Sequence, residues 1–336
     1  MKILITGGSG FIGSSLIKYL LKNFKDYQVL NIDKLTYASN NSLEEYSNEK
    51  NYHHLKIDIT DDNNLMDAFL NFKPNCVMHL AAESHVDNSI KNPNEFIKTN
   101  IIGTFNMLNC SLEYFNEFQP LNFRFHHIST DEVYGDLEKD DPKFTELNPY
   151  NPSSPYSASK ASSDHLVRAW GRTYGLPVII TNCSNNYGPF QHSEKLIPTI
   201  INNALNHNPI PIYGDGSQIR DWLYVEDHAI ALHQVLTQGD LNETYNIGGI
   251  NEIENIVVAK KICSILNEIF PINSKEYHSY EDLIQFVDDR PGHDKRYAID
   301  CSKINNNLNW LPVEDFDSGM LKTVKWYLNR FNQKIK

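Results

Sequence analysis

The feature that most limits the fold of this chain is a glycine-rich turn directly after a short apolar run at the N-terminus. Residues Lys2–Thr6 form that run, and Gly7, Gly10 and Gly13 follow it as Gly-x-x-Gly-x-x-Gly. Glycine permits a positive φ in a tight turn, lets the backbone approach a diphosphate, and lets the next helix pack closely on the strand. The first turn of that helix offers unpaired N–H groups and a positive dipole end to phosphates. The pattern therefore predicts a dinucleotide site, with a ligand-free glycine turn as the alternative.

Short β-rich runs alternate with amphipathic stretches through the first half of the chain. This alternation predicts right-handed βαβ crossovers and an α/β fold with a doubly wound, mainly parallel sheet of the Rossmann type. The expected strands are Lys2–Thr6, Gln28–Asp33, His54–Ile59, Cys76–Ala82, Arg124–Thr130 and Val178–Cys183. The expected helices are Ile12–Phe24, Asn63–Phe72, Asn94–Phe118, Pro155–Tyr174 and, near the end of the chain, Phe316–Phe331.

The character of the sequence changes after about Cys183. Loops become richer in Asn, Pro and Gly, and the elements become shorter. We expect residues 1–183 to form the NAD-binding domain and residues 184–336 to form a smaller, mostly helical substrate-binding lobe, with segments exchanged between the two.

Composition excludes several classes of protein. Hydrophobic residues make up 40% of the 336 residues and charged residues 21%, which is ordinary for a globular protein. No apolar run approaches the ~20 residues of a membrane span, and we expect no signal peptide. The net charge of −12 argues against broad nucleic-acid binding. Five scattered cysteines without a Cys-x-x-Cys pair predict neither a disulfide framework nor a metal site, and favour a cytoplasmic protein.

Asp33 ends the second expected strand, about twenty residues after the last glycine of the turn. A carboxylate there hydrogen-bonds the adenosine ribose hydroxyls and repels a 2′-phosphate, which favours NAD over NADP. The neighbouring Lys34 weakens this prediction, because a lysine could neutralise such a phosphate. A simple strand-end cap is the alternative role for Asp33.

Tyr156 and Lys160 are four residues apart and therefore share one face of a helix. The ammonium group is expected to stabilise the phenolate and lower the pKa of Tyr156, which would make it a base near neutral pH. Tyrosine–lysine pairs at positions 46/50 and 52/56 have the same spacing, but we expect them in solvated loops. Only Tyr156 follows Ser154 and Pro155, which can cap a helix and occupy its first turn.

The expected strand Arg124–Thr130 runs directly into Asp131 and Glu132. Adjacent residues of a regular strand point to opposite faces, so the two carboxyl groups converge only if the chain turns out of the strand here. Neighbouring carboxyl groups at a ligand-binding strand end tend to separate in pKa, leaving one protonated acid and one ionised base. An elimination needs such a pair, whereas a solvated pair of loop charges is the alternative.

Several motifs together resemble the extended short-chain dehydrogenase/reductases, which act mostly on nucleotide sugars. Thr-Gly-Gly-x-Gly-Phe-Ile-Gly at residues 6–13 and Tyr-Ser-Ala-Ser-Lys at residues 156–160 carry this resemblance. Within that family, Ser-Thr-Asp-Glu-Val-Tyr-Gly at residues 129–135 is similar to the signature of the dTDP-glucose 4,6-dehydratases. Related 4-epimerases lack the acidic pair. The similarity continues through further motifs to about residue 310, and departs from the pattern at Asn88, where bacterial members usually carry arginine.

The resemblance implies dehydration of dTDP-glucose to dTDP-4-keto-6-deoxyglucose, a step of deoxysugar (rhamnose-type) biosynthesis. The sugar would be oxidised at C4, lose water across C5 and C6, and regain the hydride at C6. Tyr156 with Lys160 would take the 4-OH proton, Thr130 would hydrogen-bond the 4-oxygen, Glu132 would be the base at C5, and Asp131 would protonate the departing 6-OH. Alternatives are a UDP-glucose 4,6-dehydratase, another nucleotide-sugar epimerase or decarboxylase, and a catalytically silent NAD-binding regulator.

The family pattern also assigns the binding residues. The NAD-binding set is Gly7, Gly10, Phe11, Ile12, Gly13, Asp33, Lys34, Thr36, Asp58, Ile59, Leu80, Ala81, Ala82, Thr99, Tyr156, Lys160 and Asn186. The nucleotide-sugar-binding set is Ser84, His85, Thr130, Asn185, Lys195, Leu196, Pro211, Ile212, Tyr213, Arg220, Asn255, Arg290 and His293. Of these, Arg220 and Arg290 suit the diphosphate best, because a guanidinium fork matches phosphate oxygens. Family members are usually homodimers, and the stretches Asn94–Phe118 and Pro155–Tyr174 are candidates for that contact.

Overall fold

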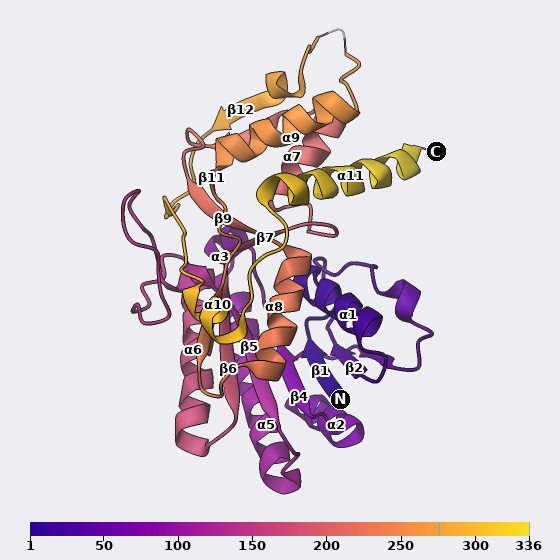
Figure 1. Cartoon of the computed structure of the whole chain (residues 1–336), viewed down its shortest axis with the longest axis vertical. Helices are drawn as coiled ribbons and strands as arrows, with labels where there is room; N and C mark the ends of the chain where they lie inside the picture. Colours follow the sequence, from indigo (N-terminus) through magenta and orange to yellow (C-terminus); the bar gives the residue numbers. More distant parts are fainter. Residues whose placement is uncertain (275, 336) are drawn as a thin grey trace.

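A central sheet of seven parallel strands organises the protein, in the order β10-β6-β5-β4-β1-β2-β3. Strands of this sheet, among them β1, β4 and β5, lie in the lower half of Figure 1. The computed structural model describes residues 1–274 and 276–335. The sheet strands are β1 (Lys2–Thr6), β2 (Gln28–Ile32), β3 (Tyr52–Leu55), β4 (Cys76–His79), β5 (Arg124–Thr130), β6 (Val178–Cys183) and β10 (Thr244–Ile247). The predicted doubly wound parallel sheet is confirmed.

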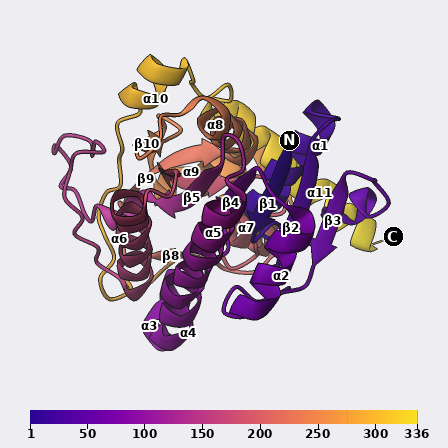
Figure 2. The same ribbon diagram turned by 90° about the horizontal axis from the view of Figure 1, so that it is seen from below.

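Helices cover both faces of this sheet (Figure 2). Side chains alternate along β1, so that Ile3 and Ile5 enter one core and Leu4 enters the core on the opposite face. All three are fully buried, and burying such a side chain contributes about 1.5–3 kcal/mol. Helices α1 (Phe11–Asn23) and α8 (Val225–Gln238) pack on the first face, and α2 (Asp62–Phe72), α5 (Thr104–Phe118) and α6 (Pro155–Tyr174) pack on the second.

The C-terminal part builds a second lobe around its own apolar core, drawn above the large sheet in Figure 1. Its strands form a β11-β9-β7 sheet and a β12-β8 pair. These strands are β7 (Asn185–Tyr187), β8 (Ile210–Tyr213), β9 (Ile219–Tyr224), β11 (Glu252–Glu254) and β12 (Ile284–Val287). The lobe helices are α7 (Leu196–Leu205), α9 (Asn255–Ile269) and α11 (Phe316–Ile335), with the 3-10 turn η4 (Tyr280–Leu283) beside α9.

The chain crosses back to the large sheet after entering the lobe. Residues of α8, β10 and α10 (Ser302–Leu308) belong to the core of the large sheet, although they follow residue 183. Sequence analysis did not predict β10, which is the seventh strand. The division at residue 183 stays a prediction.

Some element ends agree with the sequence and others differ. The ends of β2, α1 and α2 differ by one residue, and α11 continues to Ile335 rather than ending at Phe331. Strands β1, β5 and β6 and helix α6 begin and end as predicted. β4 ends at His79 rather than Ala82, because its neighbour β1 ends at Thr6, which pairs with His79. β3 spans Tyr52–Leu55 rather than His54–Ile59, because it is an edge strand whose single partner, β2, ends at Ile32 opposite Leu55.

Two further details differ from expectation. The stretch Asn94–Phe118 is helical but composed of α4 (Pro93–Phe96), a π-helical segment η2 (Ile97–Gly103) and α5, preceded by the unpredicted α3 (Val86–Lys91). The expectation of a solvated loop is wrong for Tyr52, which is buried at the start of β3 and whose hydroxyl accepts a hydrogen bond from Asn31. Tyr46, in the 3-10 turn η1 (Glu44–Tyr46), packs against the core. No described helix is long and apolar enough to span a membrane.

Candidate active site

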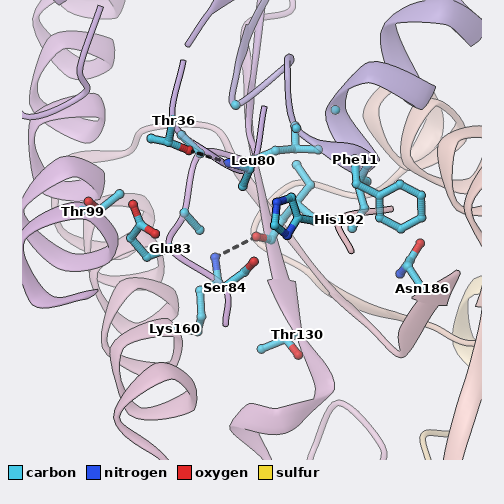
Figure 3. Close-up of a pocket in the computed structure, with 18 of the residues that line it drawn as sticks. Phe11, Thr36, Leu80, Glu83, Ser84, Thr99, Thr130, Lys160, Asn186 and His192 are labelled. Atoms are coloured by element: carbon cyan, nitrogen blue, oxygen red, sulfur yellow. Dashed lines mark hydrogen bonds between the residues drawn. The ribbon is translucent and has the colours of Figure 1, made fainter. Parts of the chain in front are cut away.

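A pocket opens where β1, β4, β5 and β6 end at the carboxyl edge of the large sheet. Its lining includes every residue of the predicted NAD-binding set except Asp58, whose carboxylate instead accepts the N–H of Thr60 at 2.9 Å. Thr130 and Lys160 lie toward one end of the pocket, while Thr36 and Phe11 lie toward the other (Figure 3). The pocket therefore has a glycine-turn end and an acid–base end, and these two names are used below.

At the glycine-turn end, backbone atoms leave no room for side chains. Gly7 has a φ of +71°, and a Cβ there would lie 2.7 Å from the backbone of Ala81. A Cβ on Gly13 would lie 2.3 Å from the carbonyl oxygen of Gly7. Gly10 precedes α1 without any side-chain cap, so the first-turn amides stay open to a ligand. This cradle fits the diphosphate of a dinucleotide.

Asp33 and Lys34 face different partners beside this turn. Asp33 accepts the N–H groups of Ser9 at 2.9 Å and Leu35 at 2.8 Å, which fixes its carboxylate in the pocket wall. The Lys34 ammonium pairs with Glu83 at 3.2 Å. Its charge is therefore neutralised within the protein, which strengthens the case for NAD over NADP at Asp33. Glu83 is absent from the predicted binding sets, although it directly follows Ala81 and Ala82, which belong to the predicted NAD-binding set.

Tyr156 and Lys160 project from the first two turns of α6, which begins as predicted. Ser154 and Ser157 form a reciprocal capping box, and Pro155 occupies the first turn. Both functional side chains are buried, and the Lys160 ammonium donates to the carbonyl oxygen of Ile128 at 2.9 Å.

The predicted lowering of the Tyr156 pKa is wrong for the protein without a ligand. Burial raises the pKa of Tyr156 well above its ordinary value, and the negative charge of Glu132 raises it further. A hydrogen bond with Thr130 opposes this rise. The sequence revealed the spacing to Lys160 but not the depth of burial, and the ammonium is directed at a backbone carbonyl.

A buried carboxylate lies one helical turn beyond Lys160. Asp164 is 3.2 Å from His127 Nε2 and accepts the Tyr150 hydroxyl at 2.9 Å. Burial lowers the pKa of Lys160, and the charge of Asp164 opposes that effect. Asp164 therefore helps to keep the ammonium charged. Its position four residues after Lys160, on the same face of the helix, is the signal for this role in the sequence.

At the acid–base end, the chain turns out of β5 as the acidic pair requires. Asp131 begins the 3-10 turn η3 (Asp131–Val133), and the Thr130 hydroxyl caps that turn by accepting the Glu132 N–H at 3.3 Å. Asp131 and Glu132 both line the pocket with Thr130 and Tyr156. The two acids therefore share one cavity.

The two carboxyl groups have different electrostatic surroundings. Burial, then the charges of Glu132 and Asp221, raise the pKa of Asp131 well above its ordinary value. Burial also raises the pKa of Glu132, but Lys195 and two arginines oppose that rise. These directions favour a protonated Asp131 beside a more readily ionised Glu132.

The cations near Glu132 are held by partners from distant parts of the chain. Lys195 donates to the carbonyl oxygen of Ser84 at 2.8 Å, and Arg290 lies 3.2 Å from a carboxylate oxygen of Asp87. Arg220 is buried, and one of its nitrogens donates to the carbonyl oxygen of Asp294 at 2.8 Å. With part of its guanidinium occupied in this way, Arg220 is less free for a diphosphate than Arg290.

The predicted nucleotide-sugar set divides into two groups. Ser84, Thr130, Asn185 and Lys195 line the pocket itself. The others lie outside that lining: His85, Leu196, Pro211, Ile212, Tyr213, Arg220, Asn255, Arg290 and His293. Asp87 of α3 connects two members of the second group, because it contacts both Arg290 and the Tyr213 hydroxyl, the latter at 3.4 Å. The side chain of Ile212 is buried in the core of the lobe.

Several lining residues were absent from the predicted sets. They come from the segment after β7 and from the ends of β5 and β6: Ser129, Ser184, Gln191, His192 and Glu194. His192 also packs edge-on against Tyr37, which follows β2. Gln191 and His192 have no sequence signal of their own and reach the pocket only through the fold, whereas Glu194 begins the stretch at residues 194–198 that is similar to the family.

Comparison with known proteins agrees with this geometry. A model of the family described as GDP-mannose 4,6 dehydratase matches residues 4–323. The chain belongs to the GDP-mannose 4,6 dehydratase family. Among characterised members, it is 59% identical to the dTDP-glucose 4,6-dehydratase of Neisseria meningitidis, over 98% of this chain and 93% of that protein.

Solved structures of family members have the same fold. The dTDP-glucose 4,6-dehydratase of Bacillus anthracis, solved in complex with NAD, is 40% identical with a TM-score of 0.87 and full coverage of both chains. DesIV, the dTDP-glucose 4,6-dehydratase of Streptomyces venezuelae, solved with NAD bound, is 38% identical with a TM-score of 0.89, covering 99% of this chain and 98% of that one.

Proposed function

We propose that this chain catalyses the NAD-dependent dehydration of dTDP-glucose to dTDP-4-keto-6-deoxyglucose. The observation that carries the proposal is the pair Asp131 and Glu132, which share one pocket with Tyr156 and Lys160. Oxidation and reduction alone need the tyrosine and lysine, whereas loss of water also needs an acid and a base. The relatives named dTDP-glucose 4,6-dehydratase support the same reaction.

The glycine-turn end would hold NAD, with the diphosphate on the first turn of α1 and the adenosine ribose at Asp33. When bound, NAD supplies a positively charged nicotinamide that accepts the hydride of sugar C4 and gives it back at C6. Lys160 contributes a second positive charge near Tyr156. Together these charges oppose the effect of burial and allow Tyr156 to take the 4-OH proton.

The acid–base end would carry out the elimination. Once C4 is a ketone, the hydrogen at C5 becomes acidic, and Glu132 removes it as the base. Asp131 gives its proton to the 6-OH, which leaves as water. Thr130 hydrogen-bonds the 4-oxygen, and Lys195 and Arg290 face the negatively charged diphosphate. The remaining predicted nucleotide-sugar residues would surround the nucleotide on the C-terminal lobe.

Product analysis tests this function directly. The purified protein is incubated separately with dTDP-glucose and UDP-glucose, and the products are weighed by mass spectrometry. We expect the mass of one water to be lost from dTDP-glucose, faster than from UDP-glucose. A product of unchanged mass would indicate an epimerase. Faster water loss from UDP-glucose would mean that UDP-glucose is the substrate. No turnover with either would favour a catalytically silent NAD-binding protein.

We also propose a homodimer formed through α5, α6 and η2. Apolar side chains are exposed on these neighbouring helices, among them Ile97, Ile102, Phe105 and Tyr174. Phe105 packs edge-on against Trp170 of α6, which makes one continuous apolar surface. Sedimentation should give a dimer for the wild type and a monomer for Phe105→Glu, while Leu147→Glu, at an exposed loop position outside these helices, should remain dimeric. A monomeric wild-type protein would contradict this proposal.

The cellular setting follows from the same chemistry. A nucleotide-sugar substrate and five free cysteines suit the cytoplasm. The 4-keto-6-deoxy product is the type of intermediate from which rhamnose-like deoxysugars are made. We therefore place the protein in cytoplasmic deoxysugar biosynthesis, a placement that metabolite analysis of a strain lacking the protein would test.

A further inference from the structure

His228 is a fully buried histidine in the first turn of α8, and it is not part of the pocket lining. Its imidazole contacts a residue of that lining, because Nδ1 lies 2.8 Å from Oδ1 of Asn186 in β7. Strand pairing brings the two residues together. Asn186 is opposite Leu223 of β9, and α8 begins at Val225, directly after β9 ends. His228 is therefore connected to the pocket through Asn186.

The main-chain carbonyl of Ser184 decides which way the Asn186 amide is turned. Asn186 Nδ2 donates to that carbonyl oxygen at 3.0 Å. In the opposite orientation two oxygens would face each other, and neither carries a proton to donate. Asn186 Oδ1 therefore faces His228.

This orientation fixes the position of the proton on His228. An amide oxygen only accepts hydrogen bonds, so Nδ1 of the ring carries the proton. Burial lowers the pKa of His228 to about 3, so the ring is neutral near pH 7 and Nε2 carries no proton. Nε2 is buried and has no hydrogen-bond partner among residues 1–274 and 276–335. The hydrogen bond with Asn186 therefore holds the ring in a single tautomer.

One N–H of Asn186 remains for a ligand. An asparagine amide has two N–H groups, and the carbonyl oxygen of Ser184 accepts one of them. Gln191 fixes the main chain at this point, because its Nε2 donates to the carbonyl oxygen of Asn186 at 2.8 Å. Asn186 lines the pocket, and Figure 3 shows it on the same side as Phe11 of the glycine-turn end. A ligand at that end is the natural acceptor for the second N–H.

We propose that His228 is a positioning residue for the cofactor, which holds the Asn186 amide so that its second N–H meets an acceptor atom of bound NAD. Without the histidine, Oδ1 of Asn186 would be buried without a donor. Rotation about Cβ–Cγ, a broad torsion in asparagine, would relieve this and turn the N–H away from NAD. The inference rests on the NAD binding of the proposed function. Since NAD is regenerated in each turnover, a contact of this kind retains it between turnovers.

The test measures how fast bound NAD exchanges with NAD in solution. NAD-loaded protein is mixed with an excess of deuterated NAD, and native mass spectrometry follows the replacement of the bound molecule. We expect exchange about 10-fold faster in His228→Leu, the effect of one hydrogen bond. In His228→Asn the amide nitrogen takes the position of Nδ1, so exchange should stay within about 2-fold of the wild type. An unchanged rate in His228→Leu would overturn the proposal.

A matched control lies on the same helix. His233 of α8 is partly buried and packs against Phe24, with 4.3 Å between the ring centroids, away from the pocket lining. His233→Leu should lower the free energy of unfolding, measured with urea, without changing the rate of NAD exchange. Equal acceleration of NAD exchange in His228→Leu and His233→Leu would mean that any change in the packing of α8 releases NAD, which would overturn the specific role of His228.

A double-mutant cycle tests whether His228 acts through Asn186. Asn186→Ala alone should accelerate NAD exchange at least as much as His228→Leu does. Adding His228→Leu to Asn186→Ala should cause no further acceleration, because the amide that the histidine holds is already absent. Two effects that multiply would mean that His228 acts by another route, and the proposal would be wrong.

A crystal structure of the wild-type protein with NAD decides the case in which the variants do not fold. Asn186 should keep its contacts with His228 and Ser184, and its Nδ2 should lie within hydrogen-bond distance of an NAD atom. An NAD molecule out of reach of this nitrogen would overturn the proposal. Absence of water loss from dTDP-glucose would instead overturn the proposed function, and the exchange rates would still decide the role of His228.

Discussion

The two ends of the pocket are built in opposite ways. The glycine-turn end is built mainly of backbone, packed so tightly that a Cβ on Gly13 would lie 2.3 Å from the carbonyl oxygen of Gly7, a near neighbour in the sequence. The acid–base end consists of side chains whose charges are set by residues far away in the sequence. Lys195 and Arg290 oppose the burial of Glu132, although they lie 63 and 158 positions after it (195 − 132 and 290 − 132).

The glycine-turn end therefore depends on the shape of the backbone, whereas the acid–base end depends on the charges of side chains. At the glycine-turn end, the smallest increase in volume should disturb folding and binding together. At the acid–base end, exchanging an acid for its amide keeps the shape and should remove the chemistry alone. Each prediction below tests one side of this comparison.

The largest effect is expected at Glu132. Glu132→Gln keeps the size of the side chain but removes the base, so dehydration should fall by about 10²–10⁴-fold. Exchange of the C5 hydrogen with deuterated water, followed by mass spectrometry, should fall with it. Asp131→Asn is the matched variant, because it should slow water loss while C5 exchange continues. Near-normal dehydration in both variants would rule out these roles.

The next effect is expected at Gly13. Gly13→Ala places a methyl group against the carbonyl oxygen of Gly7, which should lower the free energy of unfolding by about 1–3 kcal/mol and abolish NAD binding. Gly10→Ala is the control, because its Cβ would meet only the Gly7 oxygen, at 3.2 Å. It should fold normally and bind NAD more weakly. Urea unfolding and NAD content after purification measure both, and equal stability of the two variants would contradict the steric account.

The pH dependence of kcat tests whether Lys195, far away in the sequence, affects the pKa of Glu132. Burial raises the pKa of Glu132 and Lys195 opposes that rise, so kcat should decrease as the pH falls through the raised pKa of Glu132. Lys195→Met removes the opposing charge and should move this acid limb to higher pH. Lys260→Met, at an exposed position of α9, should leave the limb in place. An unchanged limb in Lys195→Met would show that Lys195 does not act on Glu132.

The smallest effect is expected on stability at Asp131. Burial raises the pKa of Asp131 in the folded protein above its unfolded value. The folded state then binds the proton more tightly, so stability is lost as the pH rises from the unfolded pKa toward the folded one. Asp131→Asn cannot ionise and should be more stable than the wild type near neutral pH by about 0.5–2 kcal/mol.

Urea unfolding at several pH values measures this difference, which should shrink as the pH approaches the ordinary aspartate pKa of about 3.9. Asp215→Asn provides a control with the opposite sign. Asp215 is exposed, and hydrogen bonds from Ser217 lower its pKa. Its replacement should give no stabilisation at neutral pH. A pH-independent difference for Asp131→Asn would contradict burial as the cause.

The local sequence pattern predicted three strands of the main sheet with the ends that the structure shows. β1, β5 and β6 have the predicted ends, since an apolar run bounded by turn residues specifies a buried strand. The local pattern did not predict the ends of β3 and β4. Each of these strands ends where the strand that it pairs with ends, and this depends on the pairing in the sheet. The local pattern also missed β10, which follows the second-lobe strands β7 to β9 in the sequence and returns to the main sheet only in three dimensions.

The lining of the pocket shows the same difference between what a local motif predicts and what only the fold brings together. Residues in contiguous motifs, such as Gly7, Asp33 and Tyr156, line it as expected. Asp58 does not line it, and Gln191 and His192 do so without any motif of their own. The raised pKa of Tyr156 could not be predicted from its spacing to Lys160, because burial has the larger effect.

The sequence by itself determined the parts that depend on neighbours along the chain. These are the glycine turn, the capped start of α6, and the exit of Asp131 and Glu132 from β5. Only the tertiary structure decided which charges surround those residues, because electrostatic free energy depends on distance and burial rather than on order in the chain.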